Sequence, residues 1–369
     1  MRATALILAA LLLPVLWSYT RALTAPGSSP VGARTVEWMS DHGMRGVVLL
    51  GERLWYAHHQ PPVGGTPAGG LPRAHDAGPG PTLPPVVTTP HLARPADIAP
   101  IAAHPLANEG VWHPIGRWLD GYPSMMSAYL RPDPVHTSLV TGVVWIDTKL
   151  VRTVLVPGTQ QPGGAVGPWH GEVPLSPRRS LLAAFNSGFK MVDARGGYFA
   201  NGHTVVPLAN GAASVVVLRD GTATVAKWGR DARMGPNVVA VRQNLALIVD
   251  HGSPVEALAN TSLRQWGQTV GNQLYVWRSG LGVTANGALV YVAGPGLSVR
   301  SLADVLARAG AVRAMELDIN TDWTTFDIFS RGPRAPQGVF ATKLLPDMYR
   351  PATRYLVPDE RDFFALFAR

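Results

Sequence analysis

Short apolar runs separated by glycine-rich and polar turns dominate the chain between residues 139 and 294. Three of these runs carry a polar turn near their middle, which is the pattern of a β-hairpin. The predicted hairpins cover residues 139–156, turning near Asp147; 213–228, turning at Asp220-Gly221; and 274–294, turning at Asn286-Gly287.

An apolar stripe with helical spacing follows at residues 302–309. We expect Ser301 to cap the N-terminus of this helix and Gly310 to end it. The next run, 311–320, alternates apolar and polar positions, as a strand does. The pattern therefore predicts an α+β fold, a mixed, strand-rich sheet domain with a few packed helices.

The stretch "AMELDINTDWTTF", residues 314–326, places four polar side chains at strand spacing: Glu316, Asp318, Asn320 and Asp322. A period of two predicts that they project from one face. Asp and Asn are poor strand formers, so their presence calls for a reason. Because clefts open at strand ends in mixed α/β sheets, we expect the carboxylates to line a pocket.

The N-terminus has a different pattern, with Arg2 preceding an apolar run that extends to Trp17. This is the pattern of a signal anchor or a signal peptide, and we favour the uncleaved anchor. We therefore expect an extracytoplasmic protein attached to the cell envelope membrane, with secretion after cleavage as the alternative. The predicted boundaries are 1–21 for the anchor or signal peptide, 22–59 for a juxtamembrane segment, 60–105 for a Pro/Gly-rich linker, and 106–369 for the domain.

The composition excludes some classes of function but does not identify one. The chain of 369 residues is 46% hydrophobic with 11 Trp, enough to bury a sizeable core. It has no cysteine, which excludes disulfides and thiol nucleophiles. The net charge is +8, but no basic run is interleaved with aromatic residues, so we do not expect a nucleic acid partner.

The first interpretation of the polar stretch is a metal site. Asp318, Asn320 and Asp322 imitate the start of an EF-hand loop. The sixth position is Trp323 instead of Gly, and the twelfth is Phe329 instead of Glu, so an EF-hand is not expected. The sequence shows no certain cofactor, and a single Ca²⁺ or Mg²⁺ held by these oxygens stays open.

Three segments combine polar groups with glycine at strand ends: "AAFNSGFKM" (183–191), "VWRSGLGVTANGALVYVAG" (276–294) and "SLADVLARAGAVRAMELDIN" (301–320). Together and in this order they resemble the phosphodiester glycosidase family, over about residues 180–325. The family's N-G-G-F turn corresponds to 186–189, its R-T-x-x-G-x-x-x-x-G segment to 278–287, and its L-D-G-G-G-S begins at Leu317-Asp318. The last motif departs at once into Ile-Asn-Thr-Asp, which indicates a divergent branch.

The resemblance implies a carbohydrate or sugar-phosphate substrate and hydrolysis of a sugar-1-phosphodiester, with N-acetylglucosamine as one sugar. It also implies that residues on the matching motifs contact the substrate. These predicted substrate-binding residues are Ser187, Gly188, Phe189, Gly280, Gly282 and Asn320.

A phosphodiester needs little general-acid help because phosphate is a good leaving group. It needs a cation for the phosphate and a carboxylate for the oxocarbenium-like centre or for water. Arg278 suits the first role, and Asp318 and Glu316, about 7 Å apart at Cα, suit the second. Asn186 is expected to orient a hydroxyl group or the water. These four residues are the predicted catalytic set.

Other interpretations of the same residues stay open. The carboxylates can instead form an ion-pair network with arginines of neighbouring strands, such as Arg242 or Arg313. The domain can be a non-catalytic envelope module that binds an anionic glycan. It can also be a calcium-dependent structural domain.

Overall fold

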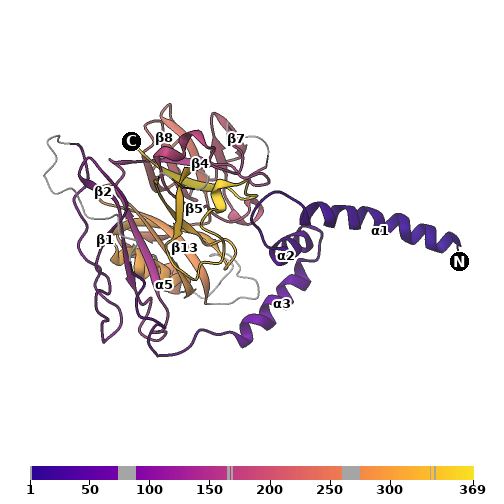
Figure 1. Cartoon of the computed structure of the whole chain (residues 1–369), viewed down its shortest axis with the longest axis horizontal. Helices are drawn as coiled ribbons and strands as arrows, with labels where there is room; N and C mark the ends of the chain where they lie inside the picture. The colour runs from indigo at the N-terminus through magenta and orange to yellow at the C-terminus, as the bar shows by residue number, and fades with distance from the viewer. Residues whose placement is uncertain are drawn as a thin grey trace.

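The computed structural model describes residues 2–73, 89–163, 167, 169–259, 275–332, 334–335 and 338–369. Helices are few and the strands carry most of the fold, so the predicted strand-rich α+β class is confirmed (Figure 1). The helices are α1 (Arg2–Leu23), α2 (Val31–Asp41), α3 (Arg45–His58), α4 (Met191–Ala194) and α5 (Val299–Arg308).

Within the described residues the strands form three antiparallel sheets. The largest has eight strands, in the order β1-β2-β3-β14-β13-β15-β11-β12. Its strands are β1 (His113–Leu119), β2 (Tyr122–Leu130), β3 (Thr141–Ile146), β14 (Leu289–Leu297), β13 (Val276–Thr284), β15 (Ala311–Ile319), β11 (Leu247–Asp250) and β12 (Ser253–Pro254).

The two smaller sheets have five strands each, in the orders β7-β6-β10-β8-β9 and β17-β16-β5-β18-β4, within the same described ranges. The first consists of β7 (His203–Val206), β6 (Tyr198–Ala200), β10 (Val238–Gln243), β8 (Ala213–Leu218) and β9 (Ala223–Lys227). The second consists of β17 (Phe340–Lys343), β16 (Phe326–Ser330), β5 (Leu181–Asn186), β18 (Phe363–Ala368) and β4 (Val151–Val156).

Both faces of the large sheet are buried, which gives the molecule its layers. On one face, Leu302 and Leu306 of α5 pack against Val290 of β14. On the other face, the main core joins all three sheets. Representative members of this main core are Leu281 from the large sheet, Val215 from the β8 sheet, and Phe185 and Phe364 from the β5 sheet.

The predicted helix is present, but it begins earlier than expected. Ser298, not Ser301, is its N-cap, and the two serines form a capping box in which each side chain bonds the other's backbone N–H. Ser301 therefore occupies the third helical position. Gly310 follows the C-cap with a φ of +90°, as predicted for the residue that ends the helix.

Two of the three predicted hairpins are confirmed. Strands β8 and β9 pair around Asp220-Gly221, and β13 and β14 pair around Asn286-Gly287. The third prediction is wrong, because β3 and β4 lie in different sheets. Asp147 does form a turn between them, but this turn carries the chain from one sheet to the next.

The N-terminal region is helical over α1, α2 and α3, and α1 projects away from the domain (Figure 1). No helix among the described residues is long and apolar enough to cross a membrane. Parts of the predicted linker contact the domain. For example, Leu92 N–H donates to the Asp147 carboxylate, and Ile98 is buried.

Candidate functional site

The carboxylates Glu316 and Asp318 lie near the C-terminal end of β15, where the pairing with β13 is irregular. The register shifts between the pairs Arg278–Ile319 and Gly280–Glu316. Such a shift is the signature of a β-bulge, which re-aims side chains and often occurs beside functional sites. The two carboxylates bind different arginines instead of sharing one.

Glu316 forms an ion pair with Arg278 at 2.5 Å, and neither side chain is exposed to solvent. The Arg278 Nε also donates to the Leu297 carbonyl oxygen. Burial, opposed by Arg278, raises the pKa of Glu316 to about 7. Arg278 therefore does not reach solvent in this structure, and its guanidinium is engaged by Glu316 rather than free to receive a phosphate.

Asp318 pairs with Arg361, a residue that follows it by 43 positions, through an Nη2–Oδ2 contact of 2.5 Å. Its second carboxylate oxygen accepts from the Ile319 N–H. Burial, opposed by Arg361, raises the pKa of Asp318 to about 6. The carboxyl group therefore changes protonation close to neutral pH, as a general acid or base must.

The predicted turn beginning at Asn186 lies directly against Asp318. The Asp318 N–H donates to the Ser187 carbonyl oxygen at 2.9 Å. The Asn186 amide donates to the Ser279 hydroxyl, and its oxygen accepts from the Tyr291 hydroxyl. Asn186 is thus held rigidly by side chains from two strands of the large sheet.

A cluster of four arginines, here called the arginine cluster, surrounds the Asp318 side of the site. Its members are Arg242, Arg350, Arg354 and Arg361, and all are buried. Arg361, Arg354 and Arg350 also lie over the Trp323 ring, at 4.8, 5.3 and 5.6 Å from its centroid. Buried guanidinium groups require carboxylate partners because desolvation of an unpaired charge is costly.

Carboxylates that immediately precede β18 supply most of those partners. Arg354 bonds Asp359 at 2.7 Å, and Arg242 bonds Asp362 at 2.8 Å. Although burial acts in the opposite direction, Arg354 and Arg350 hold the pKa of Asp359 below its ordinary value. The site is therefore an ion-pair network, as one interpretation of the sequence proposed. Its partners differ from those expected, because Glu316 and Asp318 pair with Arg278 and Arg361. Arg242 and Arg313 instead pair with Asp362 and Asp231.

Four of the predicted substrate-binding residues serve packing or turn formation in this structure. Phe189 belongs to a small apolar cluster, and a Cβ on Gly280 or Gly282 would collide with neighbours that include Leu306 and Ala311. Asn320 has a φ of +87°, which Asn tolerates better than most residues. Its side-chain oxygen accepts from the Asp322 N–H.

Ser187 and Gly188 differ from these four because they adjoin the network. The Gly188 carbonyl oxygen accepts from Arg361 Nη2, and a Cβ there would meet Asn244 at 2.8 Å. The Ser187 hydroxyl is buried and has no hydrogen-bond partner among the described residues. A buried hydroxyl without a partner is costly, and it is available to a ligand.

The metal hypothesis for Asp318, Asn320 and Asp322 finds no support in the part of the chain that the structure describes. No group of three or more His, Asp or Glu side chains there is placed to hold a metal ion. Asp318 is turned to Arg361, and Asn320 uses its oxygen in the turn.

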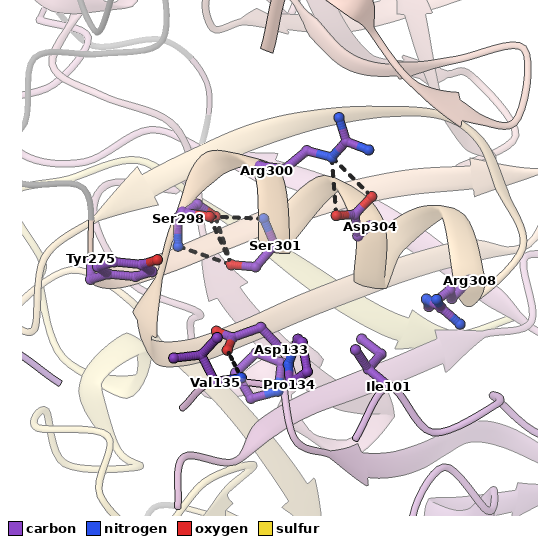
Figure 2. Close-up of a pocket in the computed structure, with 11 residues that line it drawn as sticks. Ile101, Asp133, Pro134, Val135, Tyr275, Ser298, Arg300, Ser301, Asp304 and Arg308 are labelled. Carbon is purple, nitrogen blue, oxygen red and sulfur yellow. Dashed lines mark hydrogen bonds and ion pairs between the residues drawn. The ribbon is translucent and has the colours of Figure 1, made fainter. Parts of the chain in front are cut away.

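The carboxylates that were expected to line a pocket have little contact with solvent in this structure, since Asp318 is 5% exposed and Glu316 is fully buried. A pocket of about 430 Å³ lies instead beside the N-terminus of α5 (Figure 2). Its polar groups are largely satisfied locally: Ser298 with Ser301, Arg300 with Asp304, and Asp133 with the N–H groups of Val135 and His136. The pocket contains none of the predicted site residues.

Lys190 and Arg361 were not among the site residues predicted from the sequence. Lys190 bonds Glu37 and Asp41 of α2, and Arg361 binds Asp318. A usable signal for Arg361 was the charged run "PDERD", residues 358–362, which directly precedes the buried strand β18. Charges that close to an apolar strand are expected to be buried and paired.

Comparison with known proteins shows which part of the chain carries the family resemblance. Residues 180–318 match the family model described as phosphodiester glycosidase. No curated protein matches the chain.

Several solved structures are similar to the chain at low identity, and two of them are described here. The catalytic domain of zebrafish N-acetylglucosamine-1-phosphodiester alpha-N-acetylglucosaminidase, auto-inhibited by its pro-peptide, is 16% identical with a TM-score of 0.43, covering 72% of this chain and 91% of that one. A hypothetical protein from Synechocystis is 14% identical with a TM-score of 0.36, covering 69% and 64%. Likenesses at this level carry no argument about the site.

The matched range includes Asn186, Ser187, Arg278, Glu316 and Asp318. The resemblance that the motifs indicated is thus confirmed over this range. Through residues 180–318 the chain is similar to the phosphodiester glycosidases.

Proposed function

We propose that the chain is a phosphodiester glycosidase-like hydrolase that cleaves a sugar-1-phosphodiester in a glycan outside the cytoplasm. The observation that carries the proposal is the position of Asp318. Its carboxyl group has a pKa of about 6 and is paired with Arg361, and its backbone N–H donates to the turn that begins at Asn186. Asp318 and this turn both lie inside the range that matches the family. A carboxyl group poised near neutrality beside fixed cations suits the hydrolysis of an anionic glycoside.

In the proposed reaction, water attacks the anomeric carbon and the bond from this carbon to the phosphate oxygen breaks. Asp318 takes the proton from water or stabilises the oxocarbenium-like centre. The phosphate leaves with the bonding electron pair, and nearby cations stabilise its charge. Glu316 is fully buried on Arg278, so we assign it a positioning role for the end of β15.

The test is a hydrolysis assay on the full chain with two donors, an aryl phosphodiester of N-acetylglucosamine and a simple aryl N-acetylglucosaminide. Wild-type protein is expected to release free sugar from the phosphodiester alone. Asp318→Asn is expected to lose at least about 100-fold in rate, as for loss of a general acid or base. Thermal melting shows whether the variant folds, and Asp304→Asn on α5 is the control for loss of an arginine-paired carboxylate.

A specific observation favours a second candidate, a non-catalytic module that binds an anionic glycan. The family's L-D-G-G-G-S is replaced here after Asp318, and Asp318 is covered and ion-paired. Failure of the folded wild-type protein to release sugar from either donor, with measurable binding of an anionic glycan, would support this module over the hydrolase.

A further inference from the structure

A carboxylate from the N-terminal region lies among the cations of the site. Glu37 on α2 is 3.0 Å from Lys190 Nζ and 3.8 Å from Arg361 Nη1. Lys190 also bonds Asp41, one helical turn further along α2. Lys190 immediately follows the Asn186 turn, and Arg361 is the partner of Asp318.

The chain around α2 is attached to the same region by further polar contacts. The Ser29 hydroxyl donates to Glu360 at 2.6 Å, and Arg350 Nη2 donates to the Ser28 hydroxyl at 2.9 Å. Gly27 approaches the Pro358 carbonyl oxygen so closely that a Cβ would lie 2.9 Å from it. Residues 27–41, here called the N-terminal cover, therefore lie over the site.

Under this cover, several buried donor atoms have no hydrogen-bond partner among the described residues. They are the Nε atoms of Arg361 and Arg350, Arg350 Nη1 and the Ser187 hydroxyl. Buried unpaired donors are costly, and they are uncommon in structures whose sites are filled by their natural ligands. Their concentration here indicates that the region is built to hold more acceptor oxygens than Glu37 supplies.

The geometry also relates these donors to the proposed reacting group. Arg361 contacts Asp318 through Nη2 and Glu37 through Nη1, so one guanidinium connects the two carboxylates. An anion that replaced Glu37 would bind Arg361 and Lys190 within reach of Asp318. Arg278 cannot act in this way, because Glu316 engages it in a fully buried pair.

We infer that Lys190 and Arg361, with the Ser187 hydroxyl, bind the phosphate group of the substrate, and that Glu37 occupies this phosphate position in the covered state. The inference rests on the proposed function for the identity of the anion as a sugar phosphate. Guanidinium and ammonium groups are the usual phosphate ligands of proteins. An internal competitor lowers apparent affinity by the fraction of molecules in which the position is free.

The test measures phosphate binding to the full chain by isothermal titration calorimetry at low salt, with inorganic phosphate and with N-acetylglucosamine 1-phosphate. Glu37→Ala is expected to bind both at least ten-fold more tightly than wild type. Glu37→Ala combined with Lys190→Ala is expected to lose that gain. Asp304→Ala, which removes a helix carboxylate from Arg300 on α5, is the matched control and is expected to bind like wild type.

Unchanged affinity in folded Glu37→Ala would overturn the inference, and so would an equal gain in the double variant. Because binding requires no turnover, the hydrolysis assay is an independent result. A gain in binding without hydrolysis supports the phosphate position and counts against the hydrolase. If folded Glu37→Ala hydrolyses the phosphodiester but binds phosphate no more tightly than wild type, the proposed hydrolase function stands. The inferred phosphate position is then overturned.

Discussion

At the scale of single residues, the site depends on carboxyl groups whose environment changes their chemistry. Glu316 and Asp318 are two positions apart on β15, beside an irregularity in its pairing with β13, yet one pairs with Arg278 and the other with Arg361. Their residue types and strand spacing were predictable from the sequence. Their partners were not, because Arg278 and Arg361 are separated from them by 38 and 43 positions and meet them only in the folded chain.

The raised pKa of Glu316 predicts a stability that falls as the pH rises. Burial raises this pKa from 4.5 to about 7, so between these values the folded state holds a proton that the unfolded chain has released. The free energy of unfolding then decreases by up to about 1.4 kcal/mol per pH unit. Glu316→Gln cannot ionise and is expected to flatten this decrease, measured by urea unfolding at pH 4.5, 6 and 8.

The pKa of Asp318 is also raised, so the Glu316→Gln variant is expected to keep part of the decrease in stability with rising pH. Glu256→Gln, which removes an exposed carboxyl group, is the control and is expected to keep the wild-type profile. An unchanged profile in Glu316→Gln would show that the carboxyl group of Glu316 ionises in the folded protein as it does in the unfolded chain.

At the scale of elements, local signals identified the hairpin turns and the end of α5, and misplaced its beginning. Both Ser298 and Ser301 are good capping residues, so the serine nearer the apolar stripe was the natural choice. The structure adds a turn because Val299 packs against the large sheet, which extends the apolar face backwards. The 139–156 prediction failed for a related reason, since a turn at Asp147 does not reveal which sheet the next strand joins.

The capping box predicts a measurable loss of stability. Ser298→Ala removes the acceptor for the Ser301 N–H and is expected to reduce the free energy of unfolding by about 1 kcal/mol, measured by chemical denaturation. Arg300→Ala removes only an exposed ion pair with Asp304 on the same helix and is expected to change it by less than about 0.5 kcal/mol. Equal effects of the two variants would mean that the cap contributes little.

At the scale of the whole molecule, ion pairs and hydrogen bonds of buried arginines join segments that are distant in the sequence. Arg242 on β10 binds Asp362, next to β18, across 120 positions and from one small sheet to the other. Arg350 binds Ser28 of the N-terminal cover across 322 positions. These contacts link the sheets and the cover through one region, which is also the candidate site.

Breaking the Arg242–Asp362 pair from one side should cost more than replacing both partners. Arg242→Met or Asp362→Leu alone leaves one buried charge unpaired and is expected to destabilise the protein by about 3–5 kcal/mol. The double variant Arg242→Met, Asp362→Leu is expected to recover part of that loss, measured by thermal and urea unfolding. If the two single losses simply add in the double variant, the side chains do not interact energetically.

The sequence alone determined that residues 139–156, 213–228, 274–294 and 311–320 contain strands, and where the turns between them lie, because side-chain period and glycine placement are local properties. It also identified the Asn186 turn and Asp318, since these residues lie on motifs that resemble a known family. Only the tertiary structure decided that Arg361 faces Asp318, that Arg278 is buried with Glu316, and that Glu37 covers Lys190. The physical reason is that burial and pairing of charges depend on which distant segments pack together, and a buried charge accepts whichever partner the packing brings within reach.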